Sequence, residues 1–416
     1  MMASRSSRSR NILQPKTFLV LVAALCINTL QQLGKVQAAP IKVTLDTLRN
    51  CINGSIAGRP AICCPGAEID LTNVPPVVDF IPKRDRFGGH RVKKALQCLS
   101  GEEFEVYTQK LTKAYDLMRA LPPNDPRSLH QQGIIHCAYG TGSFVQDGLS
   151  AVNNFTIDIH SSWLFLPWHR MFVYFHERIL QKLLDDPTFT LHFWNFDNGL
   201  DGTKSYGAPR HNEGCFKPGH LFPEIYNNIS SSTFEPDRSN RTLVLGIPVD
   251  LAFPVPPPLP DNAPPVPAEE AVPRNREVMH KAMERGNVSR DFFGITFKYG
   301  DPRPEPIVGG GSLEFFPHNS MHAWVGGLMR IPSTATFDPI FYPAHENVER
   351  LWDVWMQLGD NHKLQPTDPD WLDTEFLFWD ENQVLRRVKI CDSLSISDLG
   401  YSYEKVNDAS WRFLDN

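Results

Sequence analysis

Histidine is the residue type whose positions in this chain point most directly to chemistry. Six histidines fall into two groups of three, His136, His160 and His169 in the first and His318, His322 and His345 in the second. His318 and His322 are four positions apart, so one face of a helix would present both imidazoles to the same point. Three neutral nitrogens per centre, with no thiolate or carboxylate, suit copper better than a hard cation. The pattern predicts a dinuclear copper site that handles dioxygen.

Helices are expected to position these imidazoles. Proline stands one or two residues before three of the histidines, at Pro167, Pro317 and Pro343. Proline fits the first turn of a helix, because its missing N–H would have no intrahelical partner there. The same segments are rich in Trp, Phe and Leu, so we expect the imidazoles to lie in dry surroundings.

Apolar spacing predicts further elements along the chain. Residues 94–121 and 167–184 have helical spacing, and residues 129–137 lead into the first histidine of the site. Residues 40–90 are expected to form an irregular arm. Residues 376–380 and 383–390 read as two strands joined by a turn.

A proline-rich stretch covers residues 247–273. It has no helical period, so we expect an exposed polyproline-type loop there, with helix resuming over residues 274–285. A proline-rich partner motif is the alternative interpretation.

The N-terminus has the layout of a targeting sequence. Residues 1–16 carry four basic residues and no acidic one, an apolar run follows over residues 17–30, and residues 36–39 offer a small-residue cleavage site. A signal peptide for the secretory pathway is the first interpretation, leading to an extracellular or vacuolar protein. The Ser- and Arg-rich first ten residues leave a transit peptide for the plastid thylakoid lumen as the alternative. No later stretch is apolar for about 18 residues, so we expect no membrane span.

Charge and cysteine content limit the partners and the compartment. Removal of residues 1–38 takes away five basic residues and no acidic one, which moves the net charge from −6 to −11. No cluster of Lys and Arg offers a phosphate-binding face, so a nucleic-acid partner is not expected. Cys51, Cys63 and Cys64 lie in a Gly/Pro-rich stretch that needs disulfides. Seven cysteines follow the leader, and the odd number implies a free thiol or an unusual cross-link.

Several segments make the chain resemble the type 3 copper proteins, specifically the plant-type polyphenol oxidases (catechol oxidase and tyrosinase). They are IHCAYG, DIHSSWLFLPWHRMFVYFHERIL, PHNSMH and DPIFYPAHENVERLW. The later segment WLDTEFLFWDENQVLRRVKICDSL resembles the β-rich linker of this family, and the Tyr-x-Tyr pattern of Tyr401 and Tyr403 closes it. The resemblance runs from about residue 40 to the end of the sequence.

The resemblance implies a mainly α fold. A four-helix bundle would carry the two coppers, with long loops and a small β-containing C-terminal appendage. The leader, read as a signal peptide, covers residues 1–39, and the resemblance implies a catalytic domain over 40–358 and the appendage over 359–416. The six histidines would bind two copper ions. The expected activity is the oxidation of o-diphenols to o-quinones by dioxygen, with hydroxylation of monophenols as a second activity; the oligomeric state is left open.

Two further residues gain a role from the resemblance. Glu314 matches the glutamate that holds an active-site water in the family, and Asn319 matches the position that orients that water. Such a water can act as a base toward a phenol. The alternative for Asn319 is a polar residue at a helix end. Phe165 and Phe341 match aromatic rings that pack on ligand imidazoles. The implied disulfides are Cys51–Cys64 and Cys63–Cys137.

The chain also departs from the family pattern. The family commonly has a cysteine that forms a thioether to the second histidine, but here Gly140 stands in its place, so His160 should lack the cross-link. Pro332 and Ser333 stand where a bulky gating aromatic is expected, which favours a more open access to the site. The sequence ends after the Tyr-x-Tyr pattern, so the family's C-terminal shielding domain is expected to be missing, unless the sequence is that of a trimmed or partial product.

Two other classes of protein fit the same histidines. A haemocyanin-like carrier would bind dioxygen without turnover, and a zinc-loaded or non-catalytic scaffold would keep the histidines for structure. We expect none of the other histidines to be ligands. His176 lies seven residues after His169 and is expected to be structural.

Overall fold

The computed structural model describes residues 38–56, 59–61, 63–64, 69–82, 90–199, 218–255, 259–284, 289–306, 308–359, 363–406 and 411. Ala39–Asn416 forms one compact unit. The predicted targeting sequence lies outside the described residues, apart from its last two positions. No helix within the described ranges has the length and apolar character needed to cross a membrane.

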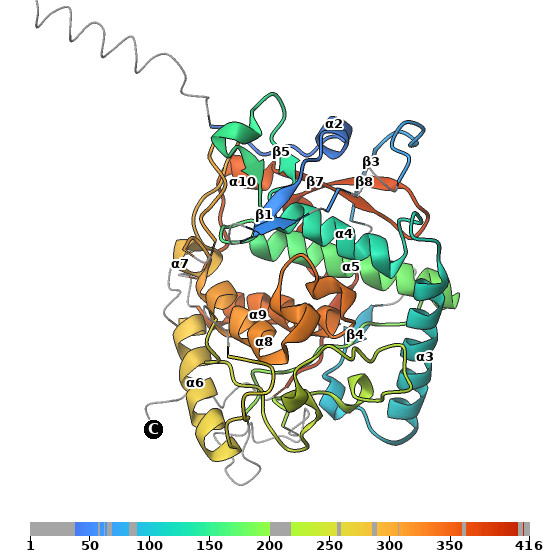
Figure 1. The fold of residues 1–416 in the computed structure, drawn as a ribbon, viewed down its shortest axis with the longest axis vertical. Coiled ribbons are helices and arrows are strands. Elements are labelled where there is room, and N and C mark those ends of the chain that lie inside the picture. Colours follow the sequence, from blue (N-terminus) through green and yellow to red (C-terminus); the bar gives the residue numbers. More distant parts are fainter. Residues whose placement is uncertain are drawn as a thin grey trace, which may run out of the picture. The chain divides into compact units, whose positions relative to one another are not determined.

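Helices build the centre of the molecule, as predicted. The main ones are α3 (Gly101–Ala120), α4 (Leu129–Gly140), α5 (Phe165–Leu184), α8 (Asn319–Val325) and α9 (Phe341–Leu358). In Figure 1, α4 and α5 cross the middle of the view and α8 and α9 lie below them. Both α3 and α9 pack against α5, which is buried along almost its whole length. Its buried charged residues Arg170 and Glu177 are paired with other elements, so α5 lies in the core as the central helix.

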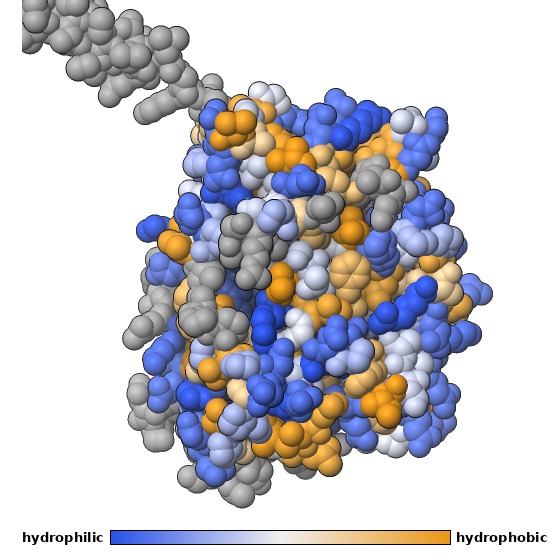
Figure 2. Space-filling view, in the orientation of Figure 1, coloured by the Kyte–Doolittle hydropathy of each residue, from blue (hydrophilic) through white to orange (hydrophobic). Residues whose placement is uncertain are grey.

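Short strands join the two ends of the unit. β7 (Glu375–Trp379) and β8 (Leu385–Lys389) form the predicted antiparallel pair. β3 (Val78–Asp79) adds to β8 in parallel, and β4 (Arg91–Lys93) pairs in parallel with β9 (Tyr401–Tyr403). The N-terminal arm is therefore held by the C-terminal segment. The arm also contains α2 (Leu45–Arg49) and the β1–β2 hairpin (Gly54–Ile56 with Arg59–Ala61), and β5 (Phe144–Val145) pairs with β6 (Thr156–Ile157) after α4. Figure 2 shows polar and apolar residues interspersed over one face of the molecule.

Disulfides tie the arm to the helical core. Cys51 is bonded to Cys64 and Cys63 to Cys137, the pairings that the resemblance implies. Cys137 directly follows His136, so the second bond fixes the arm beside the first histidine group. Cys98 is also in a disulfide, and among the described cysteines Cys391 is free and exposed.

Two helices begin elsewhere than predicted. The helix expected from residue 94 begins at Gly101, because residues 94–96 pair with Phe193 through backbone hydrogen bonds. α6 (Ala268–Glu284) begins before Pro273 rather than after it. Pro273 costs the helix one hydrogen bond, but it lies close to the N-terminus, where glutamates at positions 269 and 270 favour the helix dipole.

The first part of the proline-rich stretch is buried, so the prediction of an exposed loop over residues 247–273 is wrong there. Val249 and Leu251 are 0% exposed and Phe253 is 4% exposed. Asn275 of α6 makes this burial possible, because its amide donates to the Val249 carbonyl (2.6 Å) and accepts from the Leu251 N–H (2.8 Å). Further along, residues 259, 260, 262, 264 and 267 are exposed.

His192 is expected to make the fold sensitive to acid. The buried ring stacks on Tyr107 and its Nδ1 accepts from the Lys94 N–H (3.2 Å). Burial, together with the nearby lysines, lowers the pKa of His192 from 6.5 to about 3. The unfolded chain therefore takes up a proton that the folded chain refuses, so stability is lost as the pH falls below 6.5 toward 3. Between pH 7 and pH 4 this should cost roughly 3 kcal/mol.

The His192→Asn variant tests this expectation, because asparagine keeps an acceptor for the Lys94 N–H but does not titrate. Urea unfolding of the metal-free protein at pH 7 and pH 4 should show a weaker pH dependence in the variant. An unchanged difference between the two pH values would show that another group causes the acid sensitivity.

Candidate metal centre

The structure brings each histidine group to one point. His136 lies on α4, His169 on α5, His322 on α8 and His345 on α9, whereas His160 lies in the loop before α5 and His318 directly precedes α8. Within each group, one ring nitrogen of each histidine lies within 4.8 Å of one ring nitrogen of the other two. The rings of His169 and His345 stack with centroids 4.8 Å apart, so the two groups share a wall.

Backbone carbonyls lie at hydrogen-bond distance from the Nδ1 atoms of five of the six imidazoles, that of His318 being 3.3 Å from the Glu314 carbonyl. The Nδ1 atoms of His169 and His345 lie 2.8 and 2.9 Å from the carbonyls of Phe165 and Phe341, one helical turn earlier. His322 Nδ1 lies 2.7 Å from the Met329 carbonyl, and His136 Nδ1 lies 2.9 Å from the Pro332 carbonyl. A proton on Nδ1 leaves the Nε2 lone pair for a metal ion. In both groups Nε2 atoms converge, with 3.3 Å between His136 and His169 and 3.1 Å between His318 and His345.

The loop after α8 serves both histidine groups. Met329 and Pro332 stand three residues apart in it, and their carbonyls hold one histidine of the second group and one of the first. The sequence gives no side-chain signal for this role, which belongs to the backbone. Pro332 and Ser333 are half-buried and Ile331 is exposed.

Burial keeps these imidazoles neutral. It is the main cause that lowers the pKa values of His136, His169, His318 and His345 well below their usual range, and neighbouring imidazoles add to it. Burial likewise lowers the pKa of His322 to about 4. Neutral imidazole is the form that binds a metal ion.

Aromatic rings enclose the centre, as the resemblance implies. Phe341 stacks on His345 at 3.7 Å between centroids, and Phe165 lies 4.6 Å from His169 and 4.7 Å from His318. Trp168 lies 5.7 Å from His136. These contacts hold the imidazoles in place and exclude water.

His160 is the exception among the six. Its Nδ1 atom has no hydrogen-bond partner among the described residues, although Asp158 Oδ1 lies 3.4 Å away. Gly140 faces this ring, since a Cβ atom at Gly140 would lie only 2.7 Å from His160 Cε1. A side chain at position 140 would thus touch the His160 ring, and this chain has none there.

Peptide mapping is therefore expected to find His160 unmodified. Without a tether and without an acceptor at Nδ1, this histidine should release copper to a chelator faster than a cross-linked relative does. Mass spectrometry of the digested protein and the rate of copper loss to a chelator measure the two effects. A Cys–His cross-linked peptide would contradict the prediction.

Glu314 is buried close to the first histidine group. Its Oε1 accepts from the Ser161 N–H (2.6 Å), and its Oε2 has no partner among the described residues. Burial raises the pKa of Glu314 to about 7. Two nearby metal cations would favour the carboxylate and lower that pKa. The unpartnered oxygen can then accept a hydrogen bond from a water molecule.

Asn319 begins α8 and contacts a histidine directly. Its Oδ1 lies 3.0 Å from Nδ1 of His318 and so orients that imidazole. The sequence analysis missed this role, because it considered only a water and a helix end. An amide directly after a candidate ligand was the signal that could have suggested it.

Other histidines have partners away from the centre. His176 stacks on Tyr342 at 3.3 Å, and its Nε2 lies 3.1 Å from the Tyr115 hydroxyl. His220 Nδ1 lies 2.9 Å from the Asn198 carbonyl. Each of these rings packs into the helical core or a loop.

Buried ion pairs lie behind two of the candidate ligands. Arg170, next to His169, pairs with Glu349 of α9 at 3.0 Å. Glu346, next to His345, pairs with Lys93 of β4 at 2.5 Å. These pairs link α5, α9 and the N-terminal arm on the side away from the centre.

Two protein-family models match this chain. Residues 126–358 match the common central domain of tyrosinase, and residues 365–413 match the polyphenol oxidase middle domain. A chloroplastic polyphenol oxidase of Vitis vinifera is 35% identical over 83% of this chain and 51% of its own length. Polyphenol oxidase A1, chloroplastic, of Vicia faba is 39% identical over 76% of this chain and 48% of its own length. The chain thus spans about half the length of the curated relatives it matches.

A solved structure extends the match to the whole fold. The crystal structure of Grenache (Vitis vinifera) polyphenol oxidase has a TM-score of 0.74 and 32% identity, covering 89% of this chain and 99% of that one. The two histidine groups provide the nitrogen donors that a dinuclear copper site requires. The chain belongs to the plant-type polyphenol oxidases, a family of type 3 copper proteins with the tyrosinase central domain.

Proposed function

We propose that this protein oxidises o-diphenols to o-quinones with dioxygen, using one copper ion in each histidine group. The ligands would be His136, His160 and His169 for one ion and His318, His322 and His345 for the other. The observation that carries the proposal is the convergence of two groups of three imidazoles, in which the Nδ1 atoms of all but His160 are held by carbonyl oxygens or an amide oxygen. Bound copper would supply the electron transfer between phenol and dioxygen.

The electrons and protons of the proposed reaction balance. Each o-diphenol gives up two electrons and two protons, and dioxygen takes up four of each to form two molecules of water. Two diphenols are therefore consumed per dioxygen. The protein's part is to exclude water around the imidazoles through Phe165 and Phe341 and to accept protons from the phenol.

We further propose that Glu314 and Asn319 position a basic water. The unpartnered Glu314 Oε2 supports a bound water, and Asn319 lies five residues later in the chain, directly after His318. A base is needed for monophenols, since their hydroxyl proton is only weakly acidic. Hydroxylation of monophenols is thus the second activity to test.

Named relatives favour turnover over dioxygen carriage. Aureusidin synthase of Antirrhinum majus is 35% identical and (+)-larreatricin hydroxylase of Larrea tridentata is 37% identical to this chain. Both names describe chemistry on organic substrates. A carrier of dioxygen would give an oxygenated form without consuming a catechol.

We propose the division of the chain into a targeting segment (1–39), a catalytic domain (40–358) and a β-containing appendage (359–416). The matches to the two family models support the last two parts. Relatives named chloroplastic support plastid targeting over the secretory pathway that the leader first suggested. A fluorescent fusion carrying residues 1–45 would separate the two destinations.

The deciding experiment uses copper-reconstituted protein. Oxygen consumption with a catechol and with the matching monophenol should give turnover, and metal analysis should give two copper ions per chain. Oxygen binding without catechol consumption would favour the carrier, and zinc without an oxygenated form would favour the scaffold.

A further inference from the structure

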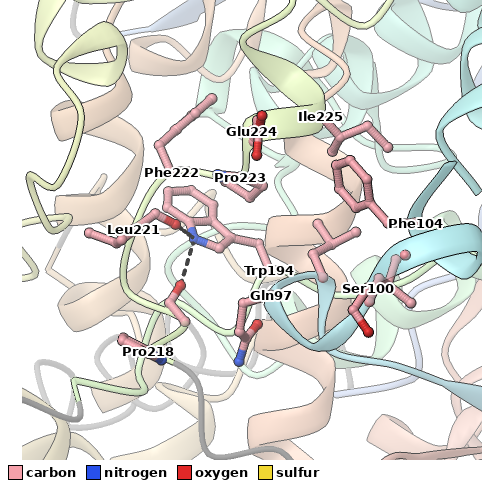
Figure 3. A pocket seen from close by; sticks show the side chains of 14 residues that line it. Gln97, Ser100, Phe104, Trp194, Pro218, Leu221, Phe222, Pro223, Glu224 and Ile225 are labelled. Atoms are coloured by element: carbon pink, nitrogen blue, oxygen red, sulfur yellow. Dashed lines mark hydrogen bonds between the residues drawn. The ribbon is translucent and has the colours of Figure 1, made fainter. Parts of the chain in front are cut away.

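A second concave site lies away from the histidines. It is a pocket of about 450 Å³ between the first residues of α3 and the loop that leads into the 3-10 turn Glu224–Tyr226. Figure 3 shows its lining side chains, among them Gln97, Phe104, Trp194 and Phe222. None of the six histidines lines it. Its volume is in the range of small-molecule sites.

Aromatic and aliphatic side chains make the walls of this pocket. Trp194 is 1% exposed, and its indole N–H donates to the carbonyls of Gly219 (3.1 Å) and Leu221 (2.9 Å), so the ring is a fixed wall (Figure 3). Phe222 packs edge-on against Trp194 at 5.3 Å. A flat apolar ring fits such walls.

One polar group in the pocket has no partner. Both the Oε1 and the Nε2 of Gln97 are buried without a hydrogen bond among the described residues. A buried amide without partners is unfavourable, so it is a recognition point for a ligand. It offers one acceptor and one donor side by side, which match a hydroxyl group that donates and accepts.

The charge of the residues around the pocket disfavours an anionic ligand. Glu224 is an exposed acidic residue of the lining, and the lining residues that the structure describes include no basic side chain. An aromatic carboxylate would meet repulsion and no compensating cation. We therefore propose that this pocket is a second, non-catalytic binding site for a small neutral phenol.

The pocket is connected to the metal centre through the backbone. The N–H of Trp194 donates to the Pro343 carbonyl (2.9 Å) in the first turn of α9, two residues before His345. A phenol in the pocket would lie against the side chain of Trp194, whose backbone is hydrogen-bonded to that turn. The binding itself does not depend on the chemistry at the histidines.

Two tryptophans allow both sites to be observed in one experiment. Copper-loaded protein labelled with 5-fluorotryptophan and kept reduced under argon is titrated with phenol and followed by fluorine NMR. The Trp194 resonance reports on the pocket, and the Trp168 resonance, beside His136, reports on the metal centre. Single Trp→Phe variants assign the two signals.

The expected result is a saturable shift of the Trp194 resonance with phenol. Benzene, which lacks the hydroxyl, and benzoate should bind at least about tenfold more weakly, the loss of roughly one good hydrogen bond. Gln97→Leu should weaken phenol by a similar factor, whereas Gln357→Leu, an exposed glutamine on α9, should not. The Trp194 response should persist in His322→Ala, which separates this inference from the function proposed for the centre.

Several outcomes would overturn the inference. They are a phenol response at Trp168 alone, equal affinity for phenol and benzene in the wild type, and tighter binding of benzylammonium than of phenol. The comparison of ligands on the wild-type protein decides the matter even if Gln97→Leu does not fold.

Discussion

Replacing His322 by alanine is expected to leave about one copper ion per chain and to abolish catechol oxidation. The imidazole is held by the Met329 carbonyl and packs against Phe341, and its Nε2 has no hydrogen-bond partner among the described residues, so that nitrogen is available to a metal ion. Loss of an outer-shell partner of a metal ligand typically costs 10–100-fold. Loss of the ligand itself should exceed that range, because a two-metal site cannot act with one metal.

His345→Ala should give the same copper content with an added loss of stability. His345 stacks on both Phe341 and His169, so its removal also leaves a cavity between α5 and α9. Metal analysis, the initial rate with catechol, and the thermal midpoint of unfolding measure the three effects.

His280→Ala is the matched control, because His280 lies on α6 and its Nδ1 contacts the Trp411 carbonyl. It should keep two copper ions and the wild-type rate. Full activity in His322→Ala would contradict the assignment of the second copper site.

The helices that carry the histidines could be predicted because their signals are local. Apolar periodicity covers α5, which begins within two residues of the predicted start, and proline marks the first turns of α5 and α9. The β7–β8 hairpin was equally accessible, since a short run of apolar residues, Phe376–Trp379, precedes a polar turn. The division of six histidines into two groups of three then predicted that these helices meet at one centre.

Contacts made by the backbone were beyond sequence reasoning. The carbonyls of Met329 and Pro332 orient two histidines, yet any residue type could provide them. Parallel pairing of β4 with β9 joins residues about 310 positions apart and has no local pattern. Two backbone groups of the buried segment, the Val249 carbonyl and the Leu251 N–H, are satisfied by the side chain of Asn275, which lies beyond the proline-rich stretch.

Polar residues with two roles were only half predicted. Asn319 was expected to orient a water, and the structure adds a contact from its Oδ1 to His318. Lys93 and Glu346 form a buried ion pair between elements that are distant in the sequence, so neither residue alone predicts the pair. Residues next to a ligand can thus serve the fold on one side of a helix and the chemistry on the other.

Glu314→Gln is expected to reduce monophenol hydroxylation about a hundredfold while diphenol oxidation stays within about threefold, the size of effect that a positioned base provides. Glutamine keeps an oxygen for the Ser161 N–H and the shape of the buried side chain. It removes the negative charge of the carboxylate, whose Oε2 has no partner among the described residues. Only the monophenol requires a proton to be taken from a weakly acidic hydroxyl before oxygen transfer, so only that reaction should suffer.

Asn319→Gly should act in the same direction, but the contact with His318 complicates it. Glycine removes both the group that would orient the water and the nearer of two acceptors for His318 Nδ1, the other being the Glu314 carbonyl at 3.3 Å, so some loss on both substrates is expected. Asn319→Asp is the matched variant, because it keeps an oxygen acceptor for His318 and adds a negative charge near the water. Diphenol oxidation should therefore be closer to the wild type in Asn319→Asp than in Asn319→Gly.

Initial rates on one monophenol and its matching catechol, with the lag removed by a trace of diphenol, measure the selectivity of each variant. Copper content is determined on the same samples, so that a loss of metal is not mistaken for a loss of base. If Glu314→Gln lowered both rates equally at full copper content, Glu314 would act by holding Ser161 and the loop of His160, and phenol deprotonation would need another base.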